Sequence, residues 1–578
     1  MVMRRLRPIS LFSLISLIAL GIMGYRRRWR IFARVLKWTP PHNQITVEIG
    51  LRVAMEDGVT LATDHYAPAT GGNHPTILIR SPYGRMAKAG AFGIFLALFA
   101  QRFAERGYHV IVQDTRGRFD SEGEFFPYFH EKQDGLDTIA WIKQQGWYNG
   151  KIGLWGPSYL GIVQWAVAAH DPAIHALVPI VTSTDMRGTI FPDDAFDLGL
   201  AMRWLTIFAL LDAYRGKPLP MQIGFIPRLE RSTKRAFAHL PIGEADAVST
   251  GAAVDFYRYW IDHADPHDPE WVTMNEDVRL AEVSAPVHLV AGWYDFFLRG
   301  QLKDYEALKA AGRHPYLTVG PWYHLQPTNP MGMIDGFREG ILWLEAHLKG
   351  ERSGLRQLPV RIYVLGAGWR DLPDFPPPST ERRYYLRGDG SLAESPEDGT
   401  CDPKRYTYDP NDPTPIRGGA AFDFRGGARD CRPLERRRDV LCYTAAVFRQ
   451  AVTMIGYLRL ELYVESSNPY TDFHGRVCDV HPNGRVVNIC EGLFRLTPDN
   501  VQRGEDGVAR ITIDLWATAY RFAAGHALRL HVSSGAHPHW ARNPGTGELF
   551  GVALRSSEQC IYHDADHPSA LVVPITEH

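Results

Sequence analysis

The pattern of apolar and polar positions changes twice along the chain, which predicts three kinds of architecture. From residue 45, "ITVEIGLRVAMEDGVTLATDHYAP" alternates apolar and polar side chains around Asp57-Gly58, as β-hairpins do. Further on, "EKQDGLDTIAWIKQQ" has helical spacing, and short apolar runs predict buried strands at "PTILIRSPYG", "YHVIVQD", "KIGLWG", "IHALVPIVTS" and "APVHLVAGWYD". Strands that alternate with helices favour a parallel sheet covered on both faces.

Residues 185–275 interrupt this alternation, because "DLGLAMRWLTIFALLDAY" and "AVDFYRYWIDHA" are helical in pattern and no strand stands out between them. The strand and helix pattern resumes near Ala285 and ends with the helix "GILWLEAHLKG". After residue 355 the helical signal nearly vanishes. Strands separated by Gly, Pro, Asp and Asn turns are predicted at "VRIYVLG", "RRYYLRGDG", "YLRLELYVESS", "ARITIDLWATAYRF" and "HALRLHVSSG". This spacing is typical of an antiparallel sandwich or jelly roll.

The fold class predicted is therefore α/β, with a helical insertion and a C-terminal β-sandwich. A chain of 578 residues is too long for one core, and 45% hydrophobic with 22% charged residues is typical of globular proteins. The expected units are an N-terminal segment (1–40), an α/β domain in two parts (45–184 and 276–352), a helical cap (185–275) and a jelly roll (356–578).

Charge and cysteine content narrow the classes of partner. A net charge of −1 and a pI of about 7.1 provide no field that attracts nucleic acid, so that partner is excluded. All six cysteines lie in the last third, and none has metal-site spacing. Free thiols are favoured over disulfides, because a domain of this size needs no covalent staples. No metal and no cofactor are predicted.

The N-terminal segment holds an apolar run, Ile9 to Gly24, between two groups of arginines. A membrane anchor through residues 4–30 is favoured over a cleaved signal peptide, a mispredicted start or a surface helix, because arginines directly after the run oppose export. The basic excess after the run favours a membrane-anchored protein with a cytoplasmic body, and an exported protein is the alternative.

Candidate catalytic residues follow three of the predicted strands. Ser158 follows "KIGLW", Asp295 follows "VHLVAGWY" and His324 follows "YLTVGPWY". A serine hydroxyl needs a base to remove its proton and a group that orients the base, and α/β hydrolases carry these in the order Ser, Asp or Glu, His. Each residue alone has a structural reading, as a turn residue, a helix cap or a packed histidine. Their joint placement at strand ends favours catalysis.

The segments "GLWGPSYLGIVQW", "GWYDFFLRG" and "GPWYHL" resemble the active-site segments of the cocaine esterase and X-Pro dipeptidyl-peptidase family (CocE/NonD, S15-like) of serine hydrolases. That family has Gly-x-Ser-Tyr-x-Gly in place of Gly-x-Ser-x-Gly. "RSPYGR", "QDTRGRFDSEGEF" and "SSGAHPHWARNPGTGE" also match, and the resemblance covers about residues 45 to 575. It implies an α/β-hydrolase fold with a cap and a jelly roll. It further implies Ser158 as nucleophile, His324 as base, Asp295 as its orienter, and an oxyanion hole from the Tyr83 hydroxyl and the Tyr159 N–H.

The function predicted is that of a serine hydrolase that cleaves a small-molecule ester or amide through an acyl-enzyme, as a carboxylesterase or acylase. An X-Pro dipeptidyl-peptidase or amino-acid ester hydrolase is the alternative, and it needs carboxylates to hold a substrate ammonium. Asp193, Asp194 and Asp197 are candidates, although a capping or solvated role is favoured for them. A sugar- or partner-binding protein with an inactive scaffold is the non-enzyme alternative. The oligomeric state is not predicted.

Two polar groups are interpreted as structural. Asp114, Arg116 and Asp120 lie in one loop and are expected to form ion pairs there. His537 and His539 have metal-like spacing, but no third ligand is evident and a structural loop is favoured.

Overall fold

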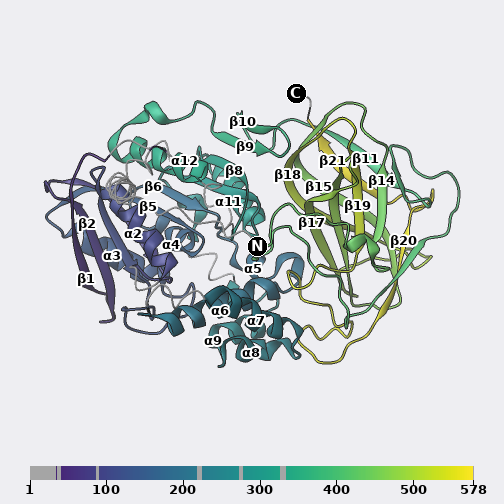
Figure 1. Cartoon of the computed structure of the whole chain (residues 1–578), viewed down its shortest axis with the longest axis horizontal. Coiled ribbons are helices and arrows are strands. Elements are labelled where there is room, and N and C mark those ends of the chain that lie inside the picture. The colour runs from purple at the N-terminus through teal and green to yellow at the C-terminus, as the bar shows by residue number, and fades with distance from the viewer. Residues whose placement is uncertain are drawn as a thin grey trace, which may run out of the picture.

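The computed structural model describes Arg34 and residues 41–85, 90–217, 224–271, 278–325 and 334–576. The apolar run of residues 9–24 and its flanking arginines lie outside this part of the chain. Among the described residues, no helix is both long enough and apolar enough to cross a bilayer. The described part consists of an α/β half and a β-rich half that pack side by side, with a group of helices along one edge (Figure 1).

A ten-stranded sheet organises the α/β half, in the order β1-β2-β4-β3-β5-β6-β7-β8-β9-β10. Neighbours from β4 to β9 pair in parallel, whereas β1, β2 and β10 pair antiparallel at the two edges. Their bounds are β1 Ile45–Ala54, β2 Thr60–Pro68, β3 His74–Ser81, β4 His109–Asp114, β5 Tyr148–Pro157, β6 Ile174–Ile180, β7 His288–Tyr294, β8 Tyr316–Tyr323, β9 Val360–Val364 and β10 Gly368–Leu372.

Helices cover both faces of this sheet, so its central strands, such as β3, β4 and β7, are buried on both sides. Ile77 and Ile79 of β3 pack into one core, whereas Leu78 between them packs into the core on the opposite face. Such continuous apolar strands are expected only when neither face meets water. The covering helices are α2 Ala91–Ala104, α3 Glu131–Lys143, α4 Tyr159–Ala168, α11 Leu298–Ala310 and α12 Ile334–Leu344.

The chain between β6 and β7 forms the group of helices along one edge of the molecule (Figure 1). It contains α5 Met186–Ile190, α6 Leu198–Tyr214, α7 Phe225–Ala238, α8 Ala245–Thr250 and α9 Asp255–Asp262. Leu205, Leu229 and Tyr257 are buried and belong to the same core as Ile77, so these helices pack onto the sheet domain. Its shorter helices are η2 Pro192–Asp194, η4 Ile242–Glu244 and η5 Leu280–Glu282. Short helices elsewhere in the chain are η7 Glu345–Lys349, η8 Arg352–Gly354 and η9 Leu434–Arg436.

The C-terminal half is an eleven-stranded β structure around one apolar core. Its longest strand, β15, pairs with β18, β20 and β21 and so joins distant parts of the chain. The strands are β11 Thr380–Leu386, β12 Ser391–Ala393, β13 Lys404–Tyr408, β14 Leu441–Ala445, β15 Val452–Ser466, β16 Thr471–Val480, β17 Val486–Leu496, β18 Ala509–Phe522, β19 Ala527–Ser533, β20 Ser557–Tyr562 and β21 Ala570–Ile575. The predicted fold class is thereby confirmed, and all six cysteines are free thiols.

The prediction that "VRIYVLG" begins the β-sandwich is wrong. This segment is β9, and it pairs in parallel with β8, with Val360 opposite Leu317. Val360, Ile362 and Val364 alternate with more exposed residues, a pattern that fits a strand in either sheet. The next residue, Leu365, exchanges backbone hydrogen bonds with β18, so the two sheets are joined at this point, before the chain turns back into β10 of the first sheet.

Candidate active site

Ser158 lies in a strained turn between β5 and α4. Its backbone has φ 59° and ψ −127°, a conformation that a residue with a side chain rarely adopts. The Ser158 N–H donates to the Ile180 carbonyl of β6 at 2.8 Å, which holds the turn against the sheet. A strained strand-to-helix turn is the arrangement that exposes the nucleophile in α/β hydrolases.

Both glycines of the predicted motif face atoms that leave no room for a side chain. A Cβ on Gly161 would lie 2.2 Å from Thr182 Cγ2, and one on Gly156 would lie 2.4 Å from Leu160 Cβ. Real Cβ atoms do not approach other heavy atoms so closely. The late glycine of "GPSYLG" therefore lets α4 pack closely against the segment after β6.

Asp295 and His324 directly follow β7 and β8, and their side chains meet Ser158. Asp295 Oδ2 lies 2.8 Å from His324 Nδ1, and His324 Nε2 lies 3.0 Å from Ser158 Oγ. When Asp295 accepts the Nδ1–H, the Nε2 is left without a proton and can accept one from the serine. Asp295 is 1% exposed, and its other oxygen accepts the Phe297 N–H at 2.9 Å. The carboxylate is thus fixed by two bonds.

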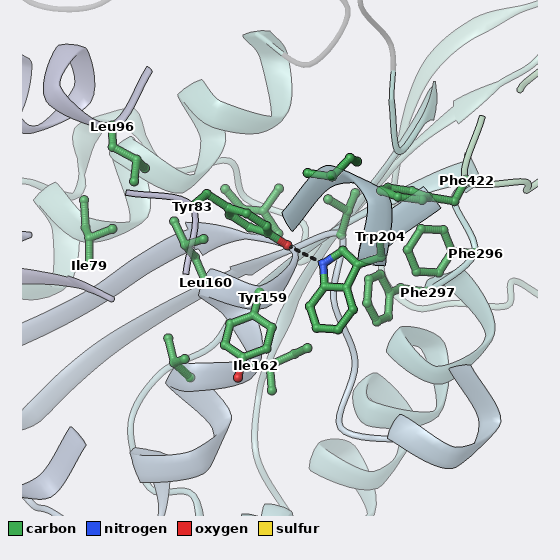
Figure 2. Close-up of a cluster of buried hydrophobic side chains, with 14 of the residues drawn as sticks. Ile79, Tyr83, Leu96, Tyr159, Leu160, Ile162, Trp204, Phe296, Phe297 and Phe422 are labelled. Atoms are coloured by element: carbon green, nitrogen blue, oxygen red, sulfur yellow. Dashed lines mark hydrogen bonds between the residues drawn. The ribbon is translucent and has the colours of Figure 1, made fainter. Parts of the chain in front are cut away.

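Tyr83 and Tyr159 lie beside Ser158 and line the same pocket. Burial raises the pKa of Tyr83 to about 12, so its hydroxyl stays protonated at neutral pH. Trp204 of α6 donates its indole N–H to this hydroxyl at 3.0 Å (Figure 2). The hydroxyl oxygen accepts this hydrogen bond, so the hydroxyl proton remains available to be donated to another acceptor. Tyr159 opens α4, and the first N–H groups of a helix have no acceptor within the helix.

The Tyr159 side chain anchors this end of α4. Its hydroxyl donates to Glu131 Oε1 at 2.7 Å and accepts the Tyr128 N–H at 3.2 Å. Glu131 in turn pairs with Arg80 at 2.8 Å. Sequence reasoning missed this anchor, because Glu131 and Arg80 stand in different elements and carry no motif.

Two sequence models of one family match most of the chain. The model described as X-Pro dipeptidyl-peptidase (S15 family) matches residues 57–326, and the X-Pro dipeptidyl-peptidase C-terminal non-catalytic domain matches 355–572. The cocaine esterase of Rhodococcus sp. (strain MB1 Bresler) is 32% identical over 92% of this chain and 98% of its own length. The chain belongs to the X-Pro dipeptidyl-peptidase and cocaine esterase family. The predicted resemblance is thereby confirmed.

Solved structures agree with this membership at the level of the fold. An aminopeptidase from the marine sediment archaeon Thaumarchaeota archaeon has a TM-score of 0.77 at 22% identity, covering 93% of this chain and 98% of its own. An α-amino acid ester hydrolase has a TM-score of 0.77 at 21% identity, covering 92% and 97%. As a member of the family, the protein is a serine hydrolase that cleaves ester or amide bonds of small molecules.

The pocket above Ser158 of this family member is walled mainly by aromatic and aliphatic side chains. Trp260 of α9 lines it. Trp204 of α6, Phe296 and Phe297 after β7, and Phe422 from the C-terminal half line it as well (Figure 2). The Phe296 and Phe422 rings lie 4.5 and 5.3 Å from the His324 ring, measured between centroids. Sheet, helical insertion and C-terminal half thus all contribute to one site.

Asp197 is the only carboxylate among the described residues that line this pocket. Its Oδ1 accepts the Leu200 N–H at 2.8 Å as the N-cap of α6, and its Oδ2 lies 2.9 Å from Nδ1 of the buried His539. Asp193 pairs with Arg299, and Asp194 pairs with Arg187 at 2.6 Å. The acidic residues named from the sequence are therefore engaged in capping and ion pairs.

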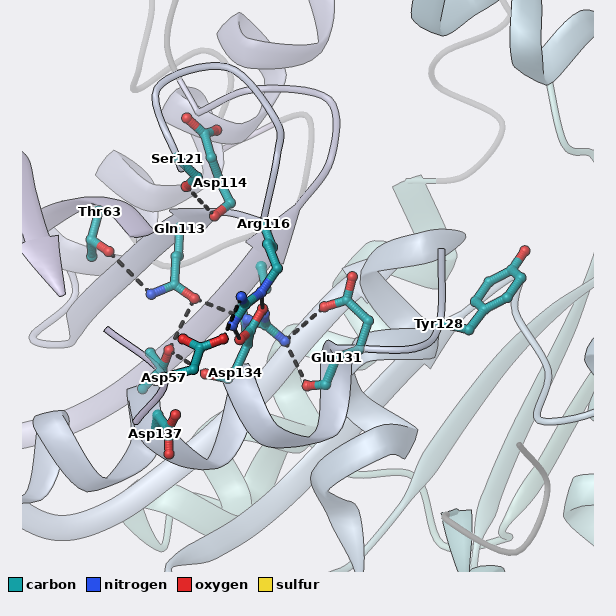
Figure 3. A network of polar contacts seen from close by, with 12 residues as sticks. Asp57, Thr63, Gln113, Asp114, Arg116, Ser121, Tyr128, Glu131, Asp134 and Asp137 are labelled. Carbon is teal, nitrogen blue, oxygen red and sulfur yellow. Dashed lines mark hydrogen bonds and ion pairs between the residues drawn. The ribbon is translucent and has the colours of Figure 1, made fainter. Parts of the chain in front are cut away.

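The polar loop after β4 forms an ion-pair network with α3 and with the β1–β2 turn (Figure 3). Arg116 lies 2.6 Å from Asp134 of α3 and 2.6 Å from Asp57 of the β1–β2 turn. Asp114 and Asp120 both pair with Arg85, which follows the Tyr83-Gly84 turn. This loop therefore fixes the backbone that presents Tyr83.

Proposed function

We propose that the protein is a carboxylesterase for esters with an apolar, preferably aromatic, acyl group. The observation that carries this proposal is the pocket wall formed by Trp204, Trp260, Phe296, Phe297 and Phe422 next to Ser158. Burying an apolar group against aromatic walls lowers the free energy of binding, whereas these walls provide no carboxylate to pair with a substrate ammonium.

In the proposed reaction Ser158 Oγ attacks the ester carbonyl while His324 Nε2 takes the hydroxyl proton. Asp295 keeps the histidine in the required tautomer and stabilises the imidazolium that forms. The negative charge that develops on the carbonyl oxygen is bound by the Tyr83 hydroxyl and the Tyr159 N–H. His324 then protonates the leaving alcohol, and a water molecule attacks the acyl-enzyme with the same base. The distances of 3.0 and 2.8 Å along this chain of residues support the assignment.

An X-Pro dipeptidyl-peptidase or amino-acid ester hydrolase is the second candidate, with which the family membership is also consistent. Such substrates carry an ammonium group that needs a free carboxylate, since an unpaired buried charge is costly. Among the described residues that line the pocket, Asp197 is the carboxylate, and its two oxygens are bound to the α6 N-terminus and to His539. These contacts favour the esterase.

The choice between the two functions is tested with a matched pair of substrates, p-nitrophenyl phenylacetate and p-nitrophenyl phenylglycinate, which differ in the α-ammonium. We expect kcat/KM for the phenylacetate to be at least tenfold higher, because transfer of an uncompensated charge opposes binding. A preference for the phenylglycinate, or rapid cleavage of glycyl-prolyl-p-nitroanilide, would instead establish the amino-substrate function.

The catalytic assignment is tested separately by labelling with a fluorophosphonate. Ser158→Ala should abolish both labelling and ester cleavage, whereas the control Ser467→Ala, on the C-terminal half, should keep both. Labelling that persists in Ser158→Ala would overturn the assignment of the nucleophile.

We also propose the domain division given above, with residues 185–275 as a cap over the site and with the start of the C-terminal domain moved to the residues after β10. Leu205 and Leu229 share a core with the sheet, which supports a cap that packs onto the sheet domain.

We propose a membrane anchor as well, which the apolar run and the arginines of residues 4–30 support. Fractionation of expressing cells tests this, because deletion of residues 1–40 should move the protein from the membrane to the soluble fraction.

A further inference from the structure

Two strand ends of the C-terminal half bring a pair of histidines together. In the antiparallel pair of β16 and β19, Asp479 lies opposite Leu528 and Val480 opposite Ala527. The next step of the same register places His481 opposite His526, just beyond the last paired residues. The two imidazole rings do lie close together there, with centroids 4.5 Å apart.

Asp479, near the end of β16, completes the group because its carboxylate reaches both histidines. Its Oδ1 and Oδ2 lie 2.9 and 2.7 Å from His526 Nδ1, and its Oδ2 lies 3.5 Å from His481 Nε2. One ligand atom from each of these three residues lies within 4.8 Å of the others. Ligand atoms of a tetrahedral zinc ion, bound at about 2.0–2.1 Å, are themselves roughly 3.3 Å apart.

We propose that Asp479, His481 and His526 bind one divalent transition-metal ion of the zinc class. Two imidazole nitrogens and one carboxylate oxygen are a ligand set that zinc uses, and a water molecule would take the fourth position. The metal replaces the hydrogen bond between His526 and Asp479, with the His526 proton moved to Nε2. The inference is independent of the proposed esterase function, since none of these residues lines the pocket at Ser158.

The surroundings of the group fit a metal site. Tyr520 of β18 donates its hydroxyl to Asp479 Oδ2 at 2.7 Å, which orients the carboxylate as outer-shell partners of metal ligands do. The Asp479 side chain is 2% exposed, whereas those of His481 and His526 are 30% and 16% exposed, which leaves an entry path from solvent. Bound metal would join the turn after β16 to the turn before β19.

A second cluster of side chains that could bind a metal, also in the C-terminal half, is less suited to a cation. Glu435, Cys442 and His531 also place their ligand atoms within 4.8 Å of one another. Arg529, however, donates to Glu435 Oε1 at 2.8 Å and already supplies the positive charge. This group therefore provides an internal control for the proposal.

The experiment uses the purified full chain, stripped with chelator and dialysed against ZnCl2, with bound metal measured by elemental analysis. We expect about one zinc per chain, and a cobalt-substituted protein with the visible absorption of four-coordinate Co²⁺. His481→Ala and His526→Ala should each weaken binding at least tenfold, and Tyr520→Phe should weaken it about tenfold through the loss of carboxylate orientation. Because a metal that binds only the folded state stabilises it, zinc should also raise the melting temperature of the wild type.

Control variants separate this site from incidental zinc binding. His531→Ala, in the second group, and His567→Ala, which pairs with Asp506 at 2.8 Å, should keep the full stoichiometry. All four histidine variants should cleave esters like the wild type. If the esterase function proposed above proves wrong, the metal-site proposal is therefore unaffected. Absence of zinc from the wild type at micromolar free metal, or full binding by the His481→Ala/His526→Ala double variant, would overturn it.

Discussion

The indole N–H of Trp204 donates a 3.0 Å hydrogen bond to the hydroxyl of Tyr83, and so joins α6 of the helical insertion to the turn after β3. The bond occupies a lone pair of the hydroxyl oxygen and restricts the direction of its proton. The Tyr83 ring itself is stacked between Phe92 and Phe208, at centroid distances of 5.2 and 5.6 Å. The proposed oxyanion donor is thus held by the helical insertion as well as by the sheet.

From this relationship we expect Trp204→Phe to lower kcat for p-nitrophenyl phenylacetate by about tenfold, since the donor loses its orientation. Tyr83→Phe should cost about 10²–10³ in kcat, the usual loss for one oxyanion donor. In the double variant the Trp204 change should add little, because it acts through the hydroxyl that is already gone. Stopped-flow or steady-state kinetics of the four proteins measure this cycle.

The matched control is Trp260→Phe, whose ring stacks on Trp204 at a centroid distance of 5.9 Å and lines the same pocket. It should alter KM more than kcat, because it changes the apolar wall alone. Equal kcat values for Trp204→Phe and wild type would contradict a positioning role for Trp204.

Gly161 gives the second prediction. A Cβ at this position would lie only 2.2 Å from Thr182 Cγ2, so Gly161→Ala must push α4 away from the segment after β6. We expect a loss of about 1–3 kcal/mol in the free energy of unfolding, as for other overpacked sites, and a fall in kcat because Tyr159 moves with the helix. Thr182→Gly in the same chain should restore part of both, which urea unfolding and ester cleavage can measure.

Gly146→Ala is the control for this substitution, because no atom lies within 4 Å of the position of its Cβ. It should leave kcat unchanged and alter stability by less than Gly161→Ala does. If Thr182→Gly gives no rescue, close packing against Thr182 is not the reason for the glycine.

The sequence sufficed to predict the residues whose position follows from a strand end. Ser158, Asp295 and His324 each directly follow a parallel strand, and such ends meet at one edge of a sheet. Trp204 could not be found in this way, because it lies within a helix and its apolar neighbours predict only burial. The register that places His481 beside His526 was equally out of reach, since their separation along the chain carries no spacing signal.

The wrong assignment of β9 has a related cause. The pattern of Val360, Ile362 and Val364 records that alternate side chains are buried, but not which sheet buries them. Which sheet takes up β9 depends on β8. In the order of the first sheet, one edge of β8 pairs with β7 and the other edge is free to pair with β9. Alternation therefore predicts strands well and their partners poorly.

Arg116 gives the third prediction. It lies 2.6 Å from the fully buried Asp134 and 2.6 Å from Asp57, and Asp134 has one further cation nearby, Arg80 at 3.7 Å. Arg116→Met should lower the free energy of unfolding by about 3–5 kcal/mol, because it leaves a buried carboxylate without its main partner. Replacing Asp134 by Asn in the same chain should recover part of this loss, which thermal or urea unfolding can measure.

An exposed ion pair serves as the comparison for Arg116. Lys143 lies 2.5 Å from Asp171, and its side chain is 38% exposed. Lys143→Met should therefore cost at most about 1 kcal/mol. Similar losses for the Arg116 and Lys143 variants would show that burial adds nothing to the Arg116 pair.

Asp304 of α11 gives a prediction about pH. Burial raises its pKa to about 7, although both carboxylate oxygens accept hydrogen bonds from Thr184. The folded state thus holds a proton that the unfolded state has released above pH 4, so stability falls as the pH rises from about 4 to 7. Asp304→Asn removes this titration, and the stability of the wild type relative to the variant should decline by roughly 1.4 kcal/mol per pH unit in that window. Urea unfolding at pH 5 and pH 8 measures the difference, with Asp255→Asn, which changes an exposed carboxyl, as control. A difference between wild type and Asp304→Asn that stays constant with pH would show that Asp304 is ionised throughout this range.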